Sequence, residues 1–279
     1  MAKTAIVTDS TAYLAADVRD KHKIHMIPLQ ITFGMESFEE EREVTVEEFY
    51  ARAAGEQPKT SQPPIGEFIN LYKKLAQDHD EILSIHLSSG ISGTFSGSLQ
   101  AAELIENAKV FTYDSEISCA MQGFYVLKAA EMADQGIGAM EIIKQLEEMK
   151  RSMRAFFMVE DLMHLQRGGR LSGAQAIVGS MLQIKPLLHF CDTKIVPFEK
   201  VRTRKKAMSR IVSLLEEDLR SGNAVKATII HANRKEDANQ WKIELERKFT
   251  TVEFDISYFG PVIGTHLGEG SMGLGWVNK

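Results

Sequence analysis

The sequence predicts an α/β protein in which an N-terminal doubly wound domain with a parallel sheet is followed by an α+β domain. Apolar runs of strand length alternate with helical patterns in the first half. This alternation ends near residue 154, after which strands and helices follow in mixed order. The 279 residues, 44% of them hydrophobic, are enough for two domains of ordinary size. We therefore predict domains at residues 1–154 and 155–279.

The predicted strands of the first half are short apolar runs that end in polar residues, at 4–8, 26–33, 82–87 and 109–113. Pro28 indicates an edge or a bulge in the second run. Thr45 and Glu48 have the spacing of a capping box, so a helix should begin there and continue through Ala53. Further helices are expected near 63–75, after Ser92, and at 119–134 and 138–153.

A hairpin and a long helix are the clearest elements of the second half. Two apolar runs, at 187–190 and 194–198, flank Cys191-Asp192-Thr193 and predict the hairpin. The long helix covers roughly 204–220 and stops at Gly222. The other expected elements are strands at 155–159, 227–231 and 252–258, a helical segment at 160–166 and an apolar helix through 176–182.

Composition limits the class of protein. A net charge of -5 and a pI near 6.0 argue against a protein built mainly to hold nucleic acid. Cys119 and Cys191 lack metal-ligand spacing and form no disulfide framework, which fits a reduced, cytoplasmic protein. No apolar segment reaches the length needed to span a bilayer.

The stretch from Ser88 to Thr94 carries the most specific chemistry. A buried strand enters a glycine-rich turn, which becomes the N-terminus of a helix. Unpaired backbone N–H groups and the helix dipole make such a terminus suitable for a carboxylate or a phosphate. Ser92 could bind that anion, or it could cap the helix of an ordinary turn without a ligand.

Other polar residues lie where they could join this site. Asp9-Ser10-Thr11 and Asp114-Ser115 follow strands, at the edge of a parallel sheet where ligands bind. Thr60 and Ser61 precede a predicted helix, and their hydroxyls could cap it or share the anion with Ser92. Spacing alone favours caps.

Two features point to a partner or to catalysis. Basic residues gather at the start of the long helix, where the helix dipole favours negative charge. They form either a solvated face or a site for a phosphate-bearing partner. These residues are Lys200, Arg202, Arg204, Lys205, Lys206 and Arg210. His266 lies among glycines in a predicted tight loop. The loop could place it in a functional site, or the histidine could have only a structural role.

Two further function classes fit less well. A hydrolase or acyltransferase could use Ser92 as nucleophile and His266 as base. However, Thr94 stands where the nucleophile-elbow pattern has glycine, and no acidic residue is evidently placed to orient His266. A DNA-binding regulator would depend on the short basic run at 200–210, which has no recognisable reading motif.

The ordered motifs of the chain resemble those of the DegV family, a bacterial fatty-acid-binding group that includes the lipid-carrying subunit of fatty acid kinase. The matching segments are Asp9-Ser10-Thr11, Thr60-Ser61-Gln62-Pro63, Ser89-Gly90-Ile91-Ser92-Gly93-Thr94, Asp114-Ser115, Gly168-Gly169-Arg170-Leu171-Ser172, Ile184-Lys185-Pro186, Val201-Arg202-Thr203-Arg204-Lys205-Lys206 and Gly264-Thr265-His266.

The resemblance implies a protein that holds one long-chain fatty acid between its two domains and has no catalytic residue or cofactor of its own. By the same resemblance, the carboxylate is bound by Thr60, Ser61, Ser92, Gly93, Thr94 and His266. Arg202 and His266 would face the partner, a dihydroxyacetone-kinase-like fatty acid kinase subunit that forms the acyl phosphate for phospholipid metabolism. A cytoplasmic location, transient membrane contact and no nucleic acid partner are also expected.

Overall fold

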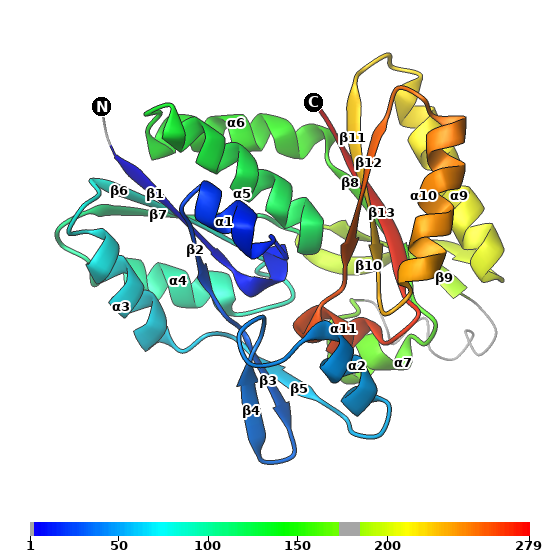
Figure 1. The fold of residues 1–279 in the computed structure, drawn as a ribbon, viewed down its shortest axis with the longest axis horizontal. Coiled ribbons are helices and arrows are strands. Elements are labelled where there is room, and N and C mark those ends of the chain that lie inside the picture. The colour runs from blue at the N-terminus through cyan, green and yellow to red at the C-terminus, as the bar shows by residue number, and fades with distance from the viewer. Residues whose placement is uncertain (1–2, 173–184) are drawn as a thin grey trace.

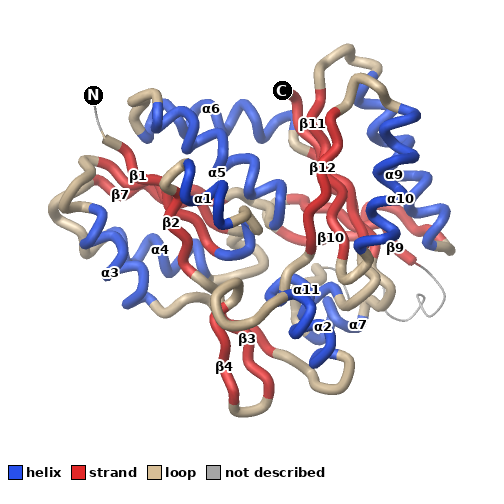
Figure 2. The backbone as a smooth tube through the Cα atoms, viewed as in Figure 1, coloured by secondary structure: helices blue, strands red, loops and turns tan. Residues whose placement is uncertain are grey.

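The computed structural model describes residues 3–172 and 185–279. Figure 1 shows two large sheets beside each other, with a small third sheet below them. In Figure 2 the strands form these separate groups, and the longer helices lie against the two large sheets. The apolar helix expected through 176–182 lies outside the described residues. In the described part of the chain, no helix is both long and apolar enough to cross a membrane.

The first sheet has the strand order β2-β1-β6-β7, and all its pairs are parallel. The helices α3 and α4 cover one face, and α5 and α6 cover the other, so the predicted doubly wound arrangement is confirmed. The bounds are β1 Thr4–Asp9, α1 Ala16–Lys21, β2 Ile24–Ile27, α3 Ile65–Leu75, β6 Glu81–His86, α4 Thr94–Ala102, β7 Lys109–Asp114, α5 Cys119–Asp134 and α6 Ala139–Ser152.

Alternation along β1 explains why helices pack on both faces. Ala5 and Val7 pack with the cluster of α3 and α4, whereas Ile6 packs with the cluster of α5 and α6. All six residues of β1 are buried, as expected for a central parallel strand.

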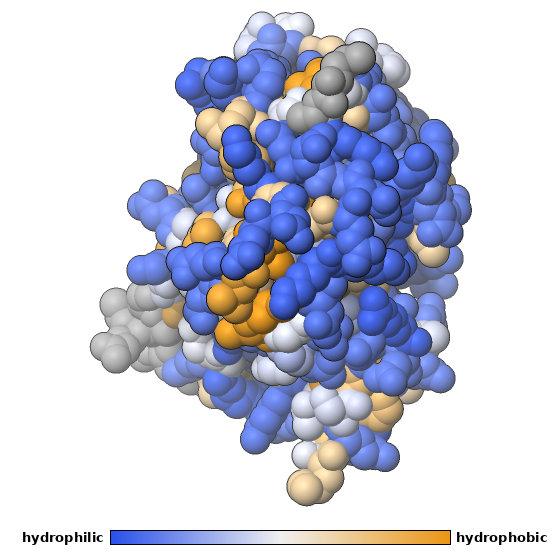
Figure 3. Space-filling model, turned by 90° about the vertical axis from the view of Figure 1, so that its left-hand side faces the viewer, coloured by the Kyte–Doolittle hydropathy of each residue, from blue (hydrophilic) through white to orange (hydrophobic). Residues whose placement is uncertain are grey.

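Leu99 of α4 is 42% exposed, so this helix leaves part of its apolar surface uncovered. Figure 3 shows a mainly hydrophilic face with one hydrophobic area near its middle.

The second sheet is mixed, with the strand order β10-β9-β8-β13-β11-β12. Only β11 and β12 pair in parallel among its described strands. The helices α9 and α10 pack on one face, and the other face shares an apolar cluster with the first half. The bounds are β8 Arg154–Met158, α7 Met163–Arg167, β9 Lys185–Cys191, β10 Lys194–Val201, α9 Arg204–Leu219, β11 Val225–His231, α10 Lys235–Lys248, β12 Glu253–Tyr258, α11 Pro261–Leu267 and β13 Met272–Asn278.

The third sheet, β4-β3-β5, corrects two sequence predictions. The single strand expected at 26–33 is divided between β2 of the first sheet and β3, because the chain turns away at Pro28-Leu29. Thr60 and Ser61 do not cap a helix, because they lie in β5 and pair with β3. The bounds are β3 Gln30–Phe33, β4 Glu36–Glu39, α2 Val46–Ala53 and β5 Lys59–Ser61.

Several local predictions are confirmed. Thr45 and Glu48 form the predicted capping box at the start of α2. The strands β9 and β10 form the predicted hairpin, and α9 begins after the cap residue Thr203. The change of sheet falls at Arg154, where β8 begins. The division into domains at 154 stays a prediction, since α2, β3 and β5 of the first half pack against α11 of the second.

Candidate functional site

An apolar cavity lies between the second sheet and the first half of the chain. Most of the side chains that line it are apolar, as is usual for small-molecule sites. Its volume is only about 50 Å³, so the cavity is narrow. Both halves of the chain line it, with Leu29, Leu87, Ile91, Ile117, Cys119 and Met121 from the first and Phe157, Phe190, Ile195, Ile230, Phe259, Val262, Ile263 and Leu267 from the second.

Glycines on β13 keep one wall of this cavity close to its neighbours. A Cβ atom at Gly275 would lie 2.2 Å from Sδ of Met121 on α5, so this side chain packs directly on the glycine. A Cβ atom at Gly273 would lie 2.8 Å from Cβ of Phe157. Both glycines therefore make room for apolar side chains that line the cavity, and the flexible Met121 side chain can adjust to what the cavity holds.

One end of the cavity is polar. Ser92, Arg170 and His266 line it there, and Arg170 and His266 also line an open cleft outside. We name this second space, which Thr60, His164 and Arg167 also border, the outer cleft. The polar end of the cavity therefore opens to solvent beside the guanidinium of Arg170, the imidazole of His266 and the hydroxyl of Ser92.

Ser92 lies in the turn before α4, as predicted. Its Oγ is 2.9 Å from Oγ1 of Thr94, and the backbone N–H of Thr94 donates to it at 3.3 Å. The cap residue of α4 is Gly93, where a Cβ atom would lie 1.9 Å from Oε1 of Gln62. The turn therefore holds the Ser92 hydroxyl at the helix N-terminus, where an anion is stabilised.

His266 lies in α11 and not in a loop, which corrects the sequence prediction. Its Nε2 is 2.8 Å from Oγ1 of Thr60, a residue 206 positions away. A Cβ atom at Gly168 would lie 2.3 Å from Nδ1 of His266, so glycine is needed at that position. Burial, with Arg170 and His164 nearby, lowers the pKa of His266 to about 4. The imidazole is therefore neutral near pH 7 before a ligand binds.

Arg170 supplies the positive charge of the polar end. Its guanidinium donates to the backbone carbonyls of Ile91, at 3.0 Å, and of Gly168. These bonds hold the charge between the Ser92 turn and the segment against which His266 packs. Sequence patterns predict no role for Arg170, and its segment from Gly168 to Ser172 contributes only to the family resemblance.

Comparison with known proteins shows the family of the chain. The family model described as "Uncharacterised protein, DegV family" matches residues 3–279. The chain belongs to the DegV family. It is 56% identical to Protein DegV of Bacillus subtilis over 278 residues, which is 99% of each chain. It is also 52% identical to a DegV domain-containing protein of Listeria innocua over 280 residues, again 99% of each.

Solved DegV-family structures share the whole fold. DegV of Bacillus subtilis, described as a fatty acid binding protein, superposes with a TM-score of 0.95 at 55% identity and full coverage of both chains. A fatty acid binding DegV family protein of Streptococcus agalactiae superposes with a TM-score of 0.92 at 32% identity, also with full coverage. The family and the fold expected from the sequence are therefore confirmed.

The remaining predicted residues of this DegV-family chain lie apart from the cavity wall. Thr60 borders the outer cleft and reaches the polar end through His266. Ser61 is exposed on β5. Arg202 is exposed between β10 and α9, and it lines neither the cavity nor the outer cleft as described. Its role, and that of Ser61, stay predictions.

Part of the basic run is neutralised by acidic neighbours. Arg204 lies 2.7 Å from Oε1 of Glu160, and Arg210 lies 2.8 Å from Oε2 of Glu199. These ion pairs leave a weaker positive field than the sequence implied.

The contacts of Ser92 and His266 also differ from what the hydrolase alternative needs. In the described residues, Ser92 contacts Thr94 and His266 contacts Thr60, with no hydrogen bond between nucleophile and base.

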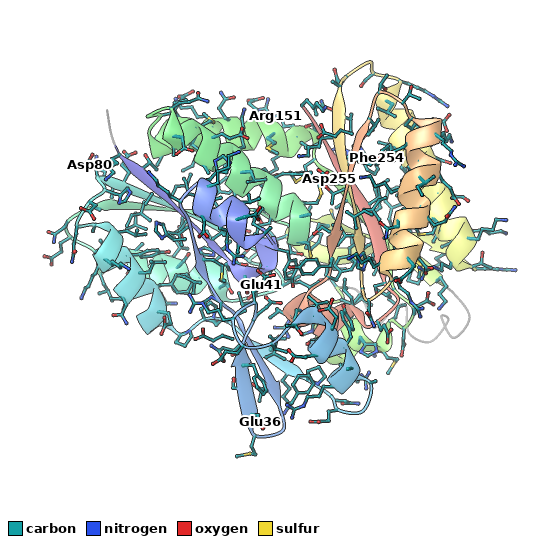
Figure 4. The ribbon with its side chains drawn as sticks, viewed as in Figure 1. Glu36, Glu41, Asp80, Arg151, Phe254 and Asp255 are labelled. Carbon is teal, nitrogen blue, oxygen red and sulfur yellow. The ribbon has the colours of Figure 1, made fainter. Side chains whose placement is uncertain are left out.

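A buried carboxyl group that the sequence analysis missed holds α11 in place. Glu40 accepts hydrogen bonds from Ser10 Oγ at 2.6 Å, Tyr13 OH at 3.0 Å and the backbone N–H of Val262 at 2.7 Å. The last of these is at the start of α11, the helix that carries His266. Burial raises the pKa of Glu40 to about 8. Figure 4 labels its neighbour Glu41, which binds Arg19 of α1 and Tyr258 of β12 and so joins the two halves nearby.

A second buried network orders the strand end before the Ser92 turn. Asp9 accepts hydrogen bonds at 3.0 Å from Nδ1 of His86, at 2.9 Å from the backbone N–H of Leu87 and at 3.1 Å from Gln122. Burial alone would raise the pKa of Asp9, but its bonds with His86, Thr11 and Leu87 prevail and lower it. The network fixes the course of the chain just before Ser88, so its role is structural support of the turn.

Proposed function

We propose that this protein binds a long-chain fatty acid in the cavity, with its carboxylate at Ser92, Arg170 and His266, and presents that carboxylate to a separate kinase. The observation that carries the proposal is a narrow apolar cavity that ends in one cation and two neutral hydrogen-bonding side chains. A single acyl chain has this distribution of apolar and anionic groups. The fatty acid binding stated for the Bacillus subtilis and Streptococcus agalactiae relatives supports the same ligand class.

The free energy of binding would come mainly from the chain. Each buried methylene contributes about 0.8 kcal/mol, so a long chain outweighs the polar end in total affinity. The carboxylate would then fix the orientation of the ligand, because Arg170 and the Ser92 turn make charge-assisted hydrogen bonds with it. An alcohol or hydrocarbon of equal length lacks that charge and should bind more weakly.

The first test is the lipid content of the protein. Purified from a bacterial host, the protein should carry about one equivalent of a long-chain fatty acid, because chain burial makes dissociation slow. Mass spectrometry of the intact protein and of its lipid extract measures this. A protein that is isolated empty and also fails to take up added fatty acid would overturn the proposal.

Ser92→Ala should weaken fatty acid binding by about tenfold to a hundredfold, because it removes a donor to the charged carboxylate, which costs about 1.5–3 kcal/mol. Thr60→Ala removes the neutral partner that orients His266 and should weaken binding by up to about tenfold, since such a bond contributes about 0.5–1.5 kcal/mol. Titration of delipidated protein with palmitic acid measures the effect. Ser96→Ala, an exposed serine of α4, is the control. Wild-type affinity in both variants would show that the carboxylate binds elsewhere.

Presentation to a kinase makes a separate prediction. The outer cleft leaves the polar end accessible from solvent, so a partner could bring ATP to the bound carboxylate. A carboxylate oxygen would attack the γ-phosphorus, and ADP would leave as the acyl phosphate forms. Arg202, exposed in the basic run, would guide docking of the partner by its charge.

Arg202→Ala should retain bound fatty acid but lose about tenfold in the rate of acyl-phosphate formation with a fatty acid kinase subunit and ATP. Bound lipid and transferred phosphate are measured on the same samples. Lys144→Ala, at an exposed lysine of α6, serves as the surface-charge control. If Arg202→Ala phosphorylates at the wild-type rate, Arg202 does not guide the partner. If wild-type protein forms acyl phosphate with ATP alone, no partner is needed.

A further inference from the structure

The cavity has a second boundary, away from the outer cleft. An open cleft of about 400 Å³, which Lys150, Arg154 and Thr193 border, lies next to the cavity. We name it the distal cleft. It shares four lining residues with the cavity, namely Ile117, Ala155, Phe156 and Phe190. It shares none of its described lining residues with the outer cleft. The two clefts therefore adjoin different parts of the cavity lining.

The register of the second sheet shows where the cavity stops. Gly273 pairs with Phe157 and Gly275 pairs with Ala155, and all four line the cavity. The next residues on the same face of these strands, Val277 and Met153, do not line it. On β9, Leu188 pairs with Phe157, so Phe190 lies at the level of Ala155. The row of Phe190, Ala155 and Gly275 is therefore the last row of the cavity in this direction.

Phe190 contributes the bulk of that end. Alternation on β9 turns Leu188 and Phe190 toward the apolar cluster around the cavity and Leu187 toward the helices on the opposite face. The Phe190 ring lies 6.3 Å from the Phe157 ring and is half-buried, packing against the apolar clusters of both halves. Phe156 instead packs with Trp276 and Phe198, and Ala155 offers only a methyl group. The Phe190 ring is thus the largest side chain between the cavity and the distal cleft.

The hairpin that carries Phe190 is held at its tip. Ser88 Oγ donates to the backbone carbonyl of Thr193 at 2.6 Å. A Cβ atom at Gly90 would lie 2.3 Å from the same carbonyl oxygen, so the two loops touch closely. Because Ser88 and Gly90 belong to the turn that leads to Ser92, one contact fixes the hairpin relative to the polar end.

We propose that Phe190 is the end wall that limits the acyl-chain length this protein accepts. This inference rests on the proposed fatty acid binding and names the residue that sets its selectivity. Without the ring, the cavity joins the distal cleft, and the methyl end of a longer chain can pass over Ala155 into it. With a larger ring, the cavity becomes shorter.

The test is a chain-length profile of delipidated protein. Affinities for myristic, palmitic, stearic, arachidic and behenic acids are measured by calorimetric titration for wild type, Phe190→Ala, Phe190→Trp and Phe198→Ala. Phe198 borders only the distal cleft among the described spaces, which makes it the matched control. Thermal unfolding of each variant confirms that it is folded.

Phe190→Ala should raise the affinity for behenic acid relative to palmitic acid by about tenfold, the effect of burying about two more methylenes. Phe190→Trp should shift the optimum toward myristic acid, and Phe198→Ala should keep the wild-type profile. The Trp variant decides the matter if the Ala variant does not fold. Unshifted profiles in folded Phe190 variants would overturn the end-wall role alone. A wild-type protein that binds none of the five acids would overturn the proposed function as well.

Discussion

In the ligand-free wild-type protein, the free energy of unfolding is expected to fall by about 5 kcal/mol between about pH 4.5 and pH 8 because of Glu40. In Glu40→Gln this fall should be absent. Burial raises the pKa of Glu40 from 4.5 to about 8. Between these values the folded state holds a proton that the unfolded state has released. The stabilising contribution of Glu40 is therefore complete below about pH 4.5, and it is lost as the pH rises through about 8.

Urea unfolding of wild type and Glu40→Gln across this pH range measures the difference in the free energy of unfolding. Glutamine keeps the size of the side chain and can still accept from Tyr13 and Val262, so the variant should fold. Glu39→Gln is the matched control, because Glu39 is the preceding residue but pairs with Arg42 at the surface. Parallel pH dependence in wild type and Glu40→Gln would mean that Glu40 is not the titrating group.

Arg170→Met is expected to weaken fatty acid binding about a hundredfold or more. The carboxylate would lose its cation at a partly desolvated end of the cavity, and leaving such a charge without its partner costs about 3–5 kcal/mol. Methionine keeps the apolar stem that packs at the cavity. The fatty acid affinity of Arg170→Lys should lie between those of wild type and Arg170→Met. Lysine keeps the charge but lacks the planar set of donors that binds the backbone carbonyls of Ile91 and Gly168.

Calorimetric titration with palmitic acid at several salt concentrations measures the effect. Arg167→Met is the control, since Arg167 is exposed on α7 and borders only the outer cleft among the described spaces. It should reduce affinity little. Wild-type affinity in Arg170→Met would place the carboxylate away from the polar end.

Local sequence patterns predicted the elements that local physics decides. The parallel sheet followed from alternating apolar runs and helices, and the capping box of Thr45 and Glu48 followed from two side chains three residues apart. The third sheet could not be predicted in this way. Pro28 is compatible with a bulge in one strand as well as with a break between two, and pairing with β5 is decided only by the folded chain.

The site was predicted in part for the same reason. Ser92 was found because a strand, a glycine turn and a helix start are contiguous in sequence. Glycines on both sides of His266 in the sequence indicate a tight loop, but Gly264 lies inside α11. There a Cβ atom would lie 2.6 Å from the hydroxyl oxygen of Tyr50, so close packing and not a turn requires glycine.

Glu40 could not have been found from sequence spacing. Its partners Ser10, Tyr13 and Val262 lie 30, 27 and 222 positions away, and only folding brings them together. For Arg170, the sequence contained one indication, the glycine pair that precedes it. Gly168 and Gly169, which has a left-handed backbone conformation, allow the chain to pass close to His266.

The most direct test of the account is a crystal structure of the protein with a palmitic acid that carries bromine at its methyl end. The anomalous signal of bromine locates the tail, and the electron density locates the carboxylate. The account predicts the carboxylate within hydrogen-bonding distance of Ser92 and Arg170, and the bromine in the last row of the cavity beside Phe190 and Gly275. A bromine at the polar end, or a chain lying outside the cavity, would contradict it.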